Sequence, residues 1–215
     1  MMDHLEGKDL VVLVPCLDIQ ESIAGLLRRP DALGIRSVSW KTEKHTLHES
    51  GVFTQCQDFL RSRLRMYRYA LVVCDRKGCR RDSDTRVVLE QDIETRLRQN
   101  GWADRSAAVV IDPTVEVWFW ADSPHVEAVL GWPSGLGTLR DWLAAKRHLP
   151  PGASKPGQPE SAFKEALAFA RKRHSASLFS QLAERLERAG LERCSDPVFL
   201  KLKSVLRAWF PPTAP

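Results

Sequence analysis

The sequence lacks several features that would place it in a specialised class of protein. No segment has the roughly 18 consecutive apolar residues that a transmembrane helix needs, and residues 1–8 have no apolar core like that of a signal peptide. The five cysteines include no Cys-x-x-Cys pair, and an odd, scattered set favours reduced thiols over a disulfide framework. The sequence also has no internal repeat or low-complexity tract. We therefore expect a globular, cytoplasmic protein without a membrane segment.

Short apolar runs take the place of the missing long ones. The chain has 215 residues, enough to bury a sizeable core. Three continuous runs rich in β-branched residues are typical of strands buried on both faces of a parallel sheet: residues 10–14, 70–74 and 107–111. A shorter fourth strand is indicated at residues 37–40. Apolar residues recur at helical spacing between these runs, over residues 19–29, 60–67 and 89–97. This alternation predicts an α/β fold with a mostly parallel sheet covered by helices.

The second half of the chain has a different pattern. Residues 115–121 are rich in aromatic side chains and fit either a strand or a helix. Helix-capping residues mark three helix starts, at Ser123-Pro124, Thr138 and Asp196-Pro197. Two more helices are predicted at residues 160–174 and 177–189, after a Pro- and Gly-rich linker at 150–159. We expect an α/β domain over residues 8–135 and a helical C-terminal region over residues 136–215.

The net charge of +5 is unevenly distributed. Residues 140–215 contain 14 Lys and Arg against 7 Asp and Glu, whereas the rest of the chain has 18 against 20. Such a basic region suits contact with nucleic acid or an acidic partner. The more ordinary explanation is a solvated helical surface, because no basic motif interleaved with aromatic residues is present.

Acidic residues follow three of the predicted strands. Asp18 and Glu21 come after the first strand, Asp75 ends the central one, and Asp112 and Glu116 follow the last. Ligands of open α/β sheets bind beyond the carboxyl ends of the strands, so neighbouring strands would gather these acids in one crevice. Clustered carboxylates bind Mg²⁺, which can activate water or hold a phosphodiester. We expect the carboxylates of Asp75 and Glu116 to lie about 4 to 6 Å apart.

Other roles compete with a metal site for these residues. Acids after strands also cap helices and satisfy turns, and Asp18 is placed to cap the first helix. Arg76 and Lys77 follow Asp75 directly, where they can bind a phosphate or a partner, or pair with the acids in place of a metal.

Two further groups suggest chemistry less strongly. His45 and His48, in a predicted polar loop at residues 41–51, together with Cys56 are suitable zinc ligands, but they lack a second paired cluster. The aromatic group at residues 118–120 is more typical of core packing than of base stacking.

The order of these pieces resembles a TOPRIM-type domain, of the divergent families found in bacterial defence and mobile-element loci. The best match is Pro113-Thr-Val-Glu-Val-Trp-Phe-Trp-Ala-Asp122, which is similar to the family's Pro-x-x-Glu-x-Trp motif followed by Asp. The central Asp75-Arg-Lys-Gly78 matches the family's Asp-x-Asp-like motif in part. Pro15-Cys16 stand where the family has Glu-Gly, with Asp18 and Glu21 nearby.

The whole chain is similar to a small component of methylation-associated antiphage defence systems of prokaryotes. Three segments carry this likeness: residues 75–79, residues 118–132, and residues 196–203 with the closing Arg207-Ala-Trp-Phe-Pro211. The resemblance implies a cytoplasmic protein that works beside methyltransferase and effector subunits.

The TOPRIM resemblance implies a first Glu as acid–base group and an Asp pair for Mg²⁺, and both motifs are altered here. Position 15 is Pro, and Lys77 stands where the second Asp would be. We therefore expect an accessory defence protein that recognises a partner protein or nucleic acid through a degenerate acidic site, holding Mg²⁺ or no cofactor. Asp75 and Glu116 are its catalytic candidates, and we expect little or no nuclease activity from the isolated protein. The alternatives are a Mg²⁺-dependent TOPRIM-type nuclease and a purely structural subunit.

Overall fold

A four-stranded parallel sheet forms the centre of the protein. The computed structural model describes residues 7–120, 124–185 and 196–212. The strands β1 (Lys8–Val14), β2 (Trp40–Lys44), β3 (Tyr67–Asp75) and β4 (Ser106–Ile111) have the order β2-β1-β3-β4. All three pairings are parallel. The expectation of an α/β fold with a parallel sheet and a helical C-terminal region is confirmed.

Three of the strands form where the apolar runs predict them. β1, β3 and β4 each contain at least five consecutive buried residues, because helices cover both faces of the sheet. The prediction for the second strand is wrong in position, since β2 begins at Trp40 rather than at residue 37. This strand lies at the edge of the sheet, and its mixed, half-exposed sequence lacks the apolar run that identifies the others.

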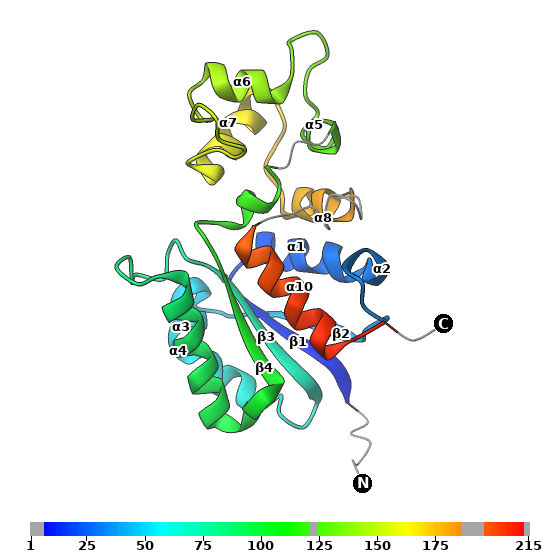
Figure 1. Cartoon of the computed structure of the whole chain (residues 1–215), viewed down its shortest axis with the longest axis vertical. Coiled ribbons are helices and arrows are strands. Elements are labelled where there is room, and N and C mark those ends of the chain that lie inside the picture. Colours follow the sequence, from blue (N-terminus) through cyan, green and yellow to red (C-terminus); the bar gives the residue numbers. More distant parts are fainter. Residues whose placement is uncertain (1–6, 121–123, 186–195, 213–215) are drawn as a thin grey trace.

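Helices cover the two faces of the sheet in two layers (Figure 1). One face packs against α3 (His48–Arg61) and α4 (Arg86–Leu97), followed by the short helical turns η1 (Arg98–Trp102) and η2 (Ala103–Arg105). The other face packs against α1 (Leu17–Leu27), α2 (Pro30–Leu33) and α10 (Pro197–Trp209). Alternate strand residues point to opposite layers, so that Val72 lies among the first set and Leu71 among the second.

The segment before β3 differs from its sequence-based prediction. Residues 41–51 are not a loop, because β2 and the start of α3 occupy most of them, and the helix expected at residues 60–67 lies earlier. Gly51 lies in the first part of α3, where it allows His45 to pack against the helix. A Cβ at this position would lie 2.0 Å from His45 Nδ1.

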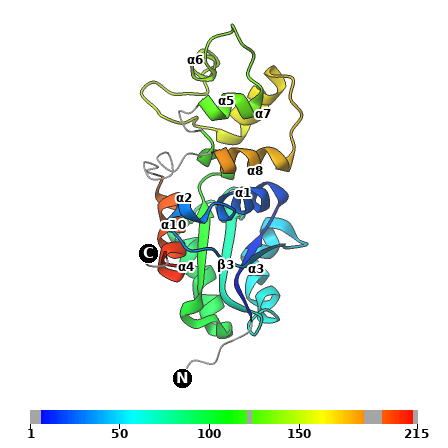
Figure 2. The ribbon, with the colours of Figure 1, turned by 90° about the vertical axis from the view of Figure 1, so that its right-hand side faces the viewer.

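A group of helices lies beyond the carboxyl ends of the strands. The short turn η3 (Val115–Trp118) leads to α5 (Pro124–Leu130), α6 (Leu139–Ala145) and α7 (Pro159–Phe169), and α8 (Ala176–Arg185) lies between this group and α1 (Figures 1 and 2). Gly25 of α1 allows close approach to α8, since a Cβ there would lie 2.8 Å from Ser180 O.

The C-terminal helices share a hydrophobic core with the sheet. The last helix α10 returns across the sheet, and its buried face joins the cluster that contains the strand residues. Thr138 caps α6 and Asp196 caps α10, as predicted, whereas Ser123 lies outside the described residues. The division into domains at about residue 135 stays a prediction.

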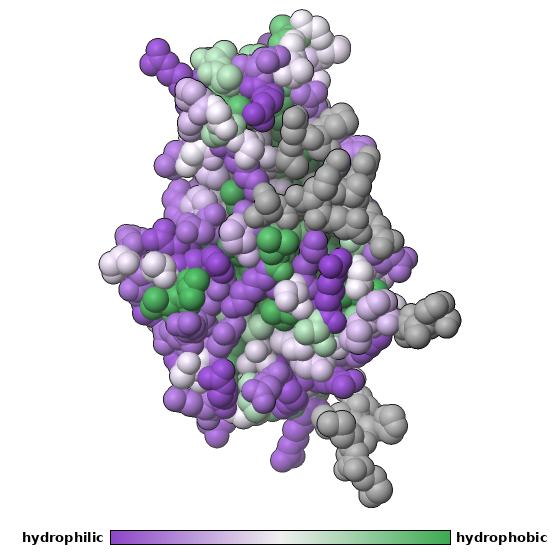
Figure 3. Space-filling model, viewed as in Figure 1, coloured by the Kyte–Doolittle hydropathy of each residue, from purple (hydrophilic) through white to green (hydrophobic). Residues whose placement is uncertain are grey.

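The surface is mixed in character. On the face drawn in Figure 3, hydrophobic residues form small separate areas among hydrophilic ones. Within the described ranges, no helix combines the length and the apolar character that crossing a membrane requires.

The outer edge of β4 is covered by side chains rather than by another strand. Glu94 of α4 accepts a hydrogen bond from the Ala108 N–H, and Glu90 accepts one from the Val110 N–H, each at 3.0 Å. Lys201 of α10 lies 3.1 Å from Glu90 Oε2 and 2.8 Å from Glu94 Oε1, so it joins both carboxylates. Because free N–H groups at a sheet edge invite pairing with other chains, these contacts close the edge.

Candidate functional site

The acidic residues predicted from the sequence meet where β3 and β4 end. Backbone hydrogen bonds from Arg76 N to Ile111 O and from Lys77 N to Pro113 O, of 2.6 and 3.1 Å, hold the two strand exits together. Asp75 is the last residue of β3, and Glu116 lies in η3, which follows β4 after a short turn. This arrangement brings Glu116 near enough for its charge to raise the pKa of Asp75.

Asp75 is held in an environment that disfavours its charge. Burial raises the pKa of Asp75 well above its usual range, and the neighbouring acids Glu116 and Glu49 raise the pKa further. A hydrogen bond from the Val115 backbone N–H opposes this shift. Among the described residues, the buried Oδ1 atom of Asp75 has no hydrogen-bond partner. This environment therefore favours the protonated form of Asp75 more than water does.

Glu116 is in a similar position. Its side chain belongs to the core layer, with 7% of the residue exposed, and its Oε2 atom has no hydrogen-bond partner within the part of the chain that the structure describes. Burial raises the pKa of Glu116, while the Thr114 side chain and the Glu116 backbone oppose this shift. The charges of Glu160 and Asp18 add smaller upward shifts to the pKa. Two buried carboxyls with incomplete hydrogen bonding thus lie at the carboxyl end of the sheet.

Asp18 joins this group from the first turn of α1. Burial raises the pKa of Asp18, while the charge of His174 opposes the shift across a separation of 3.4 Å between Nε2 and Oδ2. Asp18 does not cap α1: the residue before that helix is Cys16, whose side chain makes no capping hydrogen bond. Burial, assisted by the charges of Asp75 and Asp18, raises the pKa of the Cys16 thiol to about 12.

Two lysines meet at an acid that sequence reasoning missed. Glu160, in the first turn of α7, accepts hydrogen bonds from Lys164 and from Lys77, the latter at 2.6 Å. These two ammonium groups, Lys164 first, lower the pKa of Glu160. Lys77 therefore does not point at Asp75, its near neighbour in sequence, but reaches across to the helices beyond the sheet.

The other residues predicted at the site lie apart from this group. Asp112 is exposed and pairs with Arg76, with 3.5 Å between Oδ1 and Nη1. Arg76 also donates to the backbone carbonyls of Asp82 and Asp84, which holds the loop after β3 in place. The interactions found among the described residues do not connect Glu21 to Asp75 or Glu116.

The structure also shows the surroundings of the candidate zinc ligands and of the aromatic group. The Leu47 N–H donates to His45 Nδ1 at 3.1 Å, His48 Nδ1 lies 3.0 Å from Pro15 O, and Cys56 is buried in the layer of α3 and α4. Trp118, Phe119 and Trp120 are buried in the core, as the packing interpretation expects.

The acids fit a metal only in part. Within residues 7–120, 124–185 and 196–212, no three His, Cys, Asp or Glu side chains are placed to hold a metal ion together. Mg²⁺ often needs only one or two protein carboxylates besides water and phosphate oxygens, and the unpartnered oxygens of Asp75 and Glu116 would suit that role.

Comparison with known proteins does not extend this description. The chain has no significant match among protein-family models, curated proteins or solved structures.

Proposed function

We propose that this protein is a recognition component of a prokaryotic antiphage defence system, in which the acidic site at the carboxyl end of the sheet is degenerate. The sequence likeness to a small component of methylation-associated systems motivates the biological setting. The observation that carries the proposed lack of catalysis is the contact of Lys77 with Glu160, since it ties α7 to the loop that follows β3, next to the buried acids.

The burial of the acids supports the same proposal. Cleavage of a phosphodiester requires a proton-handling group within hydrogen-bond reach of the substrate. Asp75 Oδ1 and Glu116 Oε2 are covered by the protein, and α7 contributes Glu160 and Lys164 directly beside them. A phosphodiester would reach these carboxyl oxygens only after the residues that cover them move. Recognition through other surfaces needs no such movement.

A Mg²⁺-dependent nuclease is the second candidate function. The observation that favours it is the pair of unpartnered, buried carboxylate oxygens on Asp75 and Glu116, because buried polar atoms normally have a partner. A bound Mg²⁺ would supply a Lewis acid for phosphodiester hydrolysis at this position.

A cleavage assay separates the two candidates. Plasmid and single-stranded DNA are incubated with Mg²⁺ or Mn²⁺ and with the wild type, Asp75→Asn or Glu116→Gln. Asp112→Asn serves as the matched control, since Asp112 lies at the same end of the sheet but is exposed. We expect no cleavage above background from any of the four proteins. Cleavage by the wild type and the control that both buried-acid variants abolish would replace the proposal with the nuclease.

A further inference from the structure

The opposite end of the sheet carries a cluster of exposed arginines. Arg61 ends α3, Arg65 lies in the connection to β3, and Arg68 is the second residue of β3. Arg98 begins the neighbouring turn η1. All four side chains are exposed, and none forms an ion pair with an acid among the described residues. We call these four residues the arginine cluster.

Hydrogen bonds and packing contacts hold together the segments that carry the arginine cluster. Lys8 N donates to Met66 O at 3.0 Å, which joins the connection to the start of β1. Arg105 of η2 donates to the carbonyls of Tyr67 and Arg68, at 3.3 and 3.2 Å. The η1 turn packs on the same connection, since a Cβ at Gly101 would lie 3.2 Å from Leu64 Cδ1. The arginines therefore project from a fixed surface at the amino ends of β1, β3 and β4.

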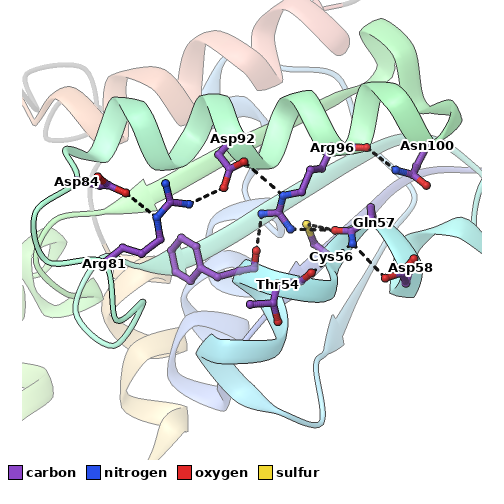
Figure 4. Close-up of polar contacts among 10 residues, drawn as sticks. Thr54, Cys56, Gln57, Asp58, Arg81, Asp84, Asp92, Arg96 and Asn100 are labelled. Atoms are coloured by element: carbon purple, nitrogen blue, oxygen red, sulfur yellow. Dashed lines mark hydrogen bonds and ion pairs between the residues drawn. The ribbon is translucent and has the colours of Figure 1, made fainter.

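Arginines elsewhere on the same layer are used inside the protein, as Figure 4 shows. Arg81 binds both Asp84 and Asp92, and Arg96 binds Asp92, Gln57 and the Phe53 carbonyl. These contacts connect the loop after β3 to α4, and α4 to α3. The members of the arginine cluster have no comparable set of acceptors in the described structure. One of them, Arg68, lies with its guanidinium carbon 5.4 Å from the centre of the Tyr69 ring.

Several lysines and arginines of the basic C-terminal region also have acceptors within the protein. Lys155 pairs with Asp196, Lys164 with Glu160, and Lys201 with Glu90 and Glu94. Lys172 and Arg207 donate to backbone carbonyls. Part of the positive charge counted in residues 140–215 therefore has acceptors within the protein, whereas Lys146, Arg171 and Arg173 are exposed. The predicted nucleic-acid contact of this region loses that part of its basis.

We propose that the arginine cluster binds the phosphate backbone of nucleic acid. This inference rests on the proposed recognition function and names its ligand and its surface. Guanidinium groups bind phosphate oxygens with two parallel hydrogen bonds, and exposed unpaired cations gain most from counterion release. Asp104 lies on η2 and offsets one of these charges, which leaves the surface positive.

The apolar and aromatic residues near the arginine cluster indicate which part of a nucleic acid it can contact. Tyr67 and Trp102 are buried, so they offer no platform for stacking unpaired bases. Met66 is exposed by 53%, but one apolar side chain is far less than the apolar face that insertion into a membrane surface requires. The arginine cluster is therefore suited to backbone phosphates without base recognition, and duplexes of different sequence should bind alike.

Binding of a short DNA duplex to the full chain tests this inference, with EDTA present so that metal-dependent chemistry does not contribute. The variant R61Q/R65Q/R68Q removes three charges from the arginine cluster. The matched control K146Q/R171Q/R173Q removes three exposed charges from the C-terminal region. Circular dichroism melts verify that both variants fold like the wild type.

We expect the wild type to bind with a steep salt dependence. The arginine variant should bind at least about tenfold more weakly at roughly 0.1 M salt, and the slope of log affinity against log salt should become shallower by about 3. The control should bind nearly as the wild type does. Equal losses in the two variants, no binding by the wild type, or binding of anionic lipid vesicles in preference to the duplex would each overturn the inference. None of these outcomes bears on the absence of cleavage, so the proposed function is tested separately.

Discussion

The two ends of the central sheet carry opposite charges and use them differently. At the carboxyl end, Asp75 and Glu116 are buried in environments that favour their protonated forms, and Glu160 pairs with lysines. At the amino end, the arginine cluster is exposed and has no acidic partners within the described residues. The acids at the carboxyl end are buried or paired within the protein, whereas the arginines at the amino end are open to an external ligand.

The sequence suggests a catalytic site at the carboxyl end of the sheet and nothing unusual at the amino end. The acids after β3 and β4 have the positions expected of an active site in an open α/β sheet. The arginine cluster lies at the amino ends of the strands, where the same reasoning expects no site. Partners, burial and exposure therefore decide which end of the sheet is open to a ligand.

The largest effect should come from Glu90, a buried acid whose partners are complete. Glu90 is 3% exposed and binds the Val110 N–H, Arg86 and Lys201, with Arg86 at 2.7 Å. We expect Glu90→Ala to lower the free energy of unfolding by about 3 to 5 kcal/mol, because its loss leaves the buried Val110 N–H and the partly buried Arg86 without an acceptor. Urea unfolding followed by tryptophan fluorescence measures this change.

Glu94 provides the control for Glu90. It also binds a β4 N–H group and Lys201, but its side chain is partly exposed. Glu94→Ala should cost only about 1 kcal/mol, the usual net value of one hydrogen bond. Equal losses of unfolding free energy in Glu90→Ala and Glu94→Ala would contradict the expectation that burial makes Glu90 the more stabilising acid.

A smaller effect of opposite sign is expected for Asp75, a buried acid whose partners are incomplete. Because the folded-state pKa is raised, the folded protein retains a proton that the unfolded chain releases near pH 4. Stability is thus lost as the pH rises from about 4 toward the folded-state pKa. Asp75→Asn removes this loss, and each pH unit of difference between the two pKa values is worth about 1.4 kcal/mol.

The measurement is the free energy of unfolding of both proteins from pH 4 to pH 8. We expect Asp75→Asn to be more stable than the wild type at pH 8 and the gap to narrow as the pH falls. Asp112→Asn, which alters an exposed acid, should show no such trend. The account of the carboxyl end is contradicted if Asp75→Asn is the less stable protein at pH 8. The acids whose charges act on Asp75 are Glu116, Glu49 and Glu160.

The sequence allowed much of the fold to be predicted, because burial on both faces leaves a continuous apolar run in a strand. This signal located β1, β3 and β4, but β2 is an edge strand without a buried residue, so it has no such run. The helix α3 was not predicted at its observed position for a related reason. Its buried residues Val52, Phe53, Cys56 and Leu60 form a sparse stripe in a polar segment, and Gly51 interrupts its first turns.

Residues of the candidate site could be predicted only where strands that are consecutive in the chain are also neighbours in the sheet. Asp75 and Glu116 meet because β3 and β4 are neighbours. Glu160 and Lys164 come from a helix that follows a long connection, and no local spacing relates them to Asp75. The role of Lys77 was open for the same reason, since its partner lies 83 positions later in the chain.

The most direct test of the difference between the two ends is to map where a duplex contacts the unaltered protein. Backbone amide signals of the full chain are followed by NMR as a short DNA duplex is added in EDTA. We predict that the changes gather at residues 61–68 and 98–105, and that residues 75–78, 112–116 and 160–164 stay unchanged. Changes confined to the carboxyl end, around Asp75 and Glu160, would contradict the assignment of ligand binding to the arginine cluster.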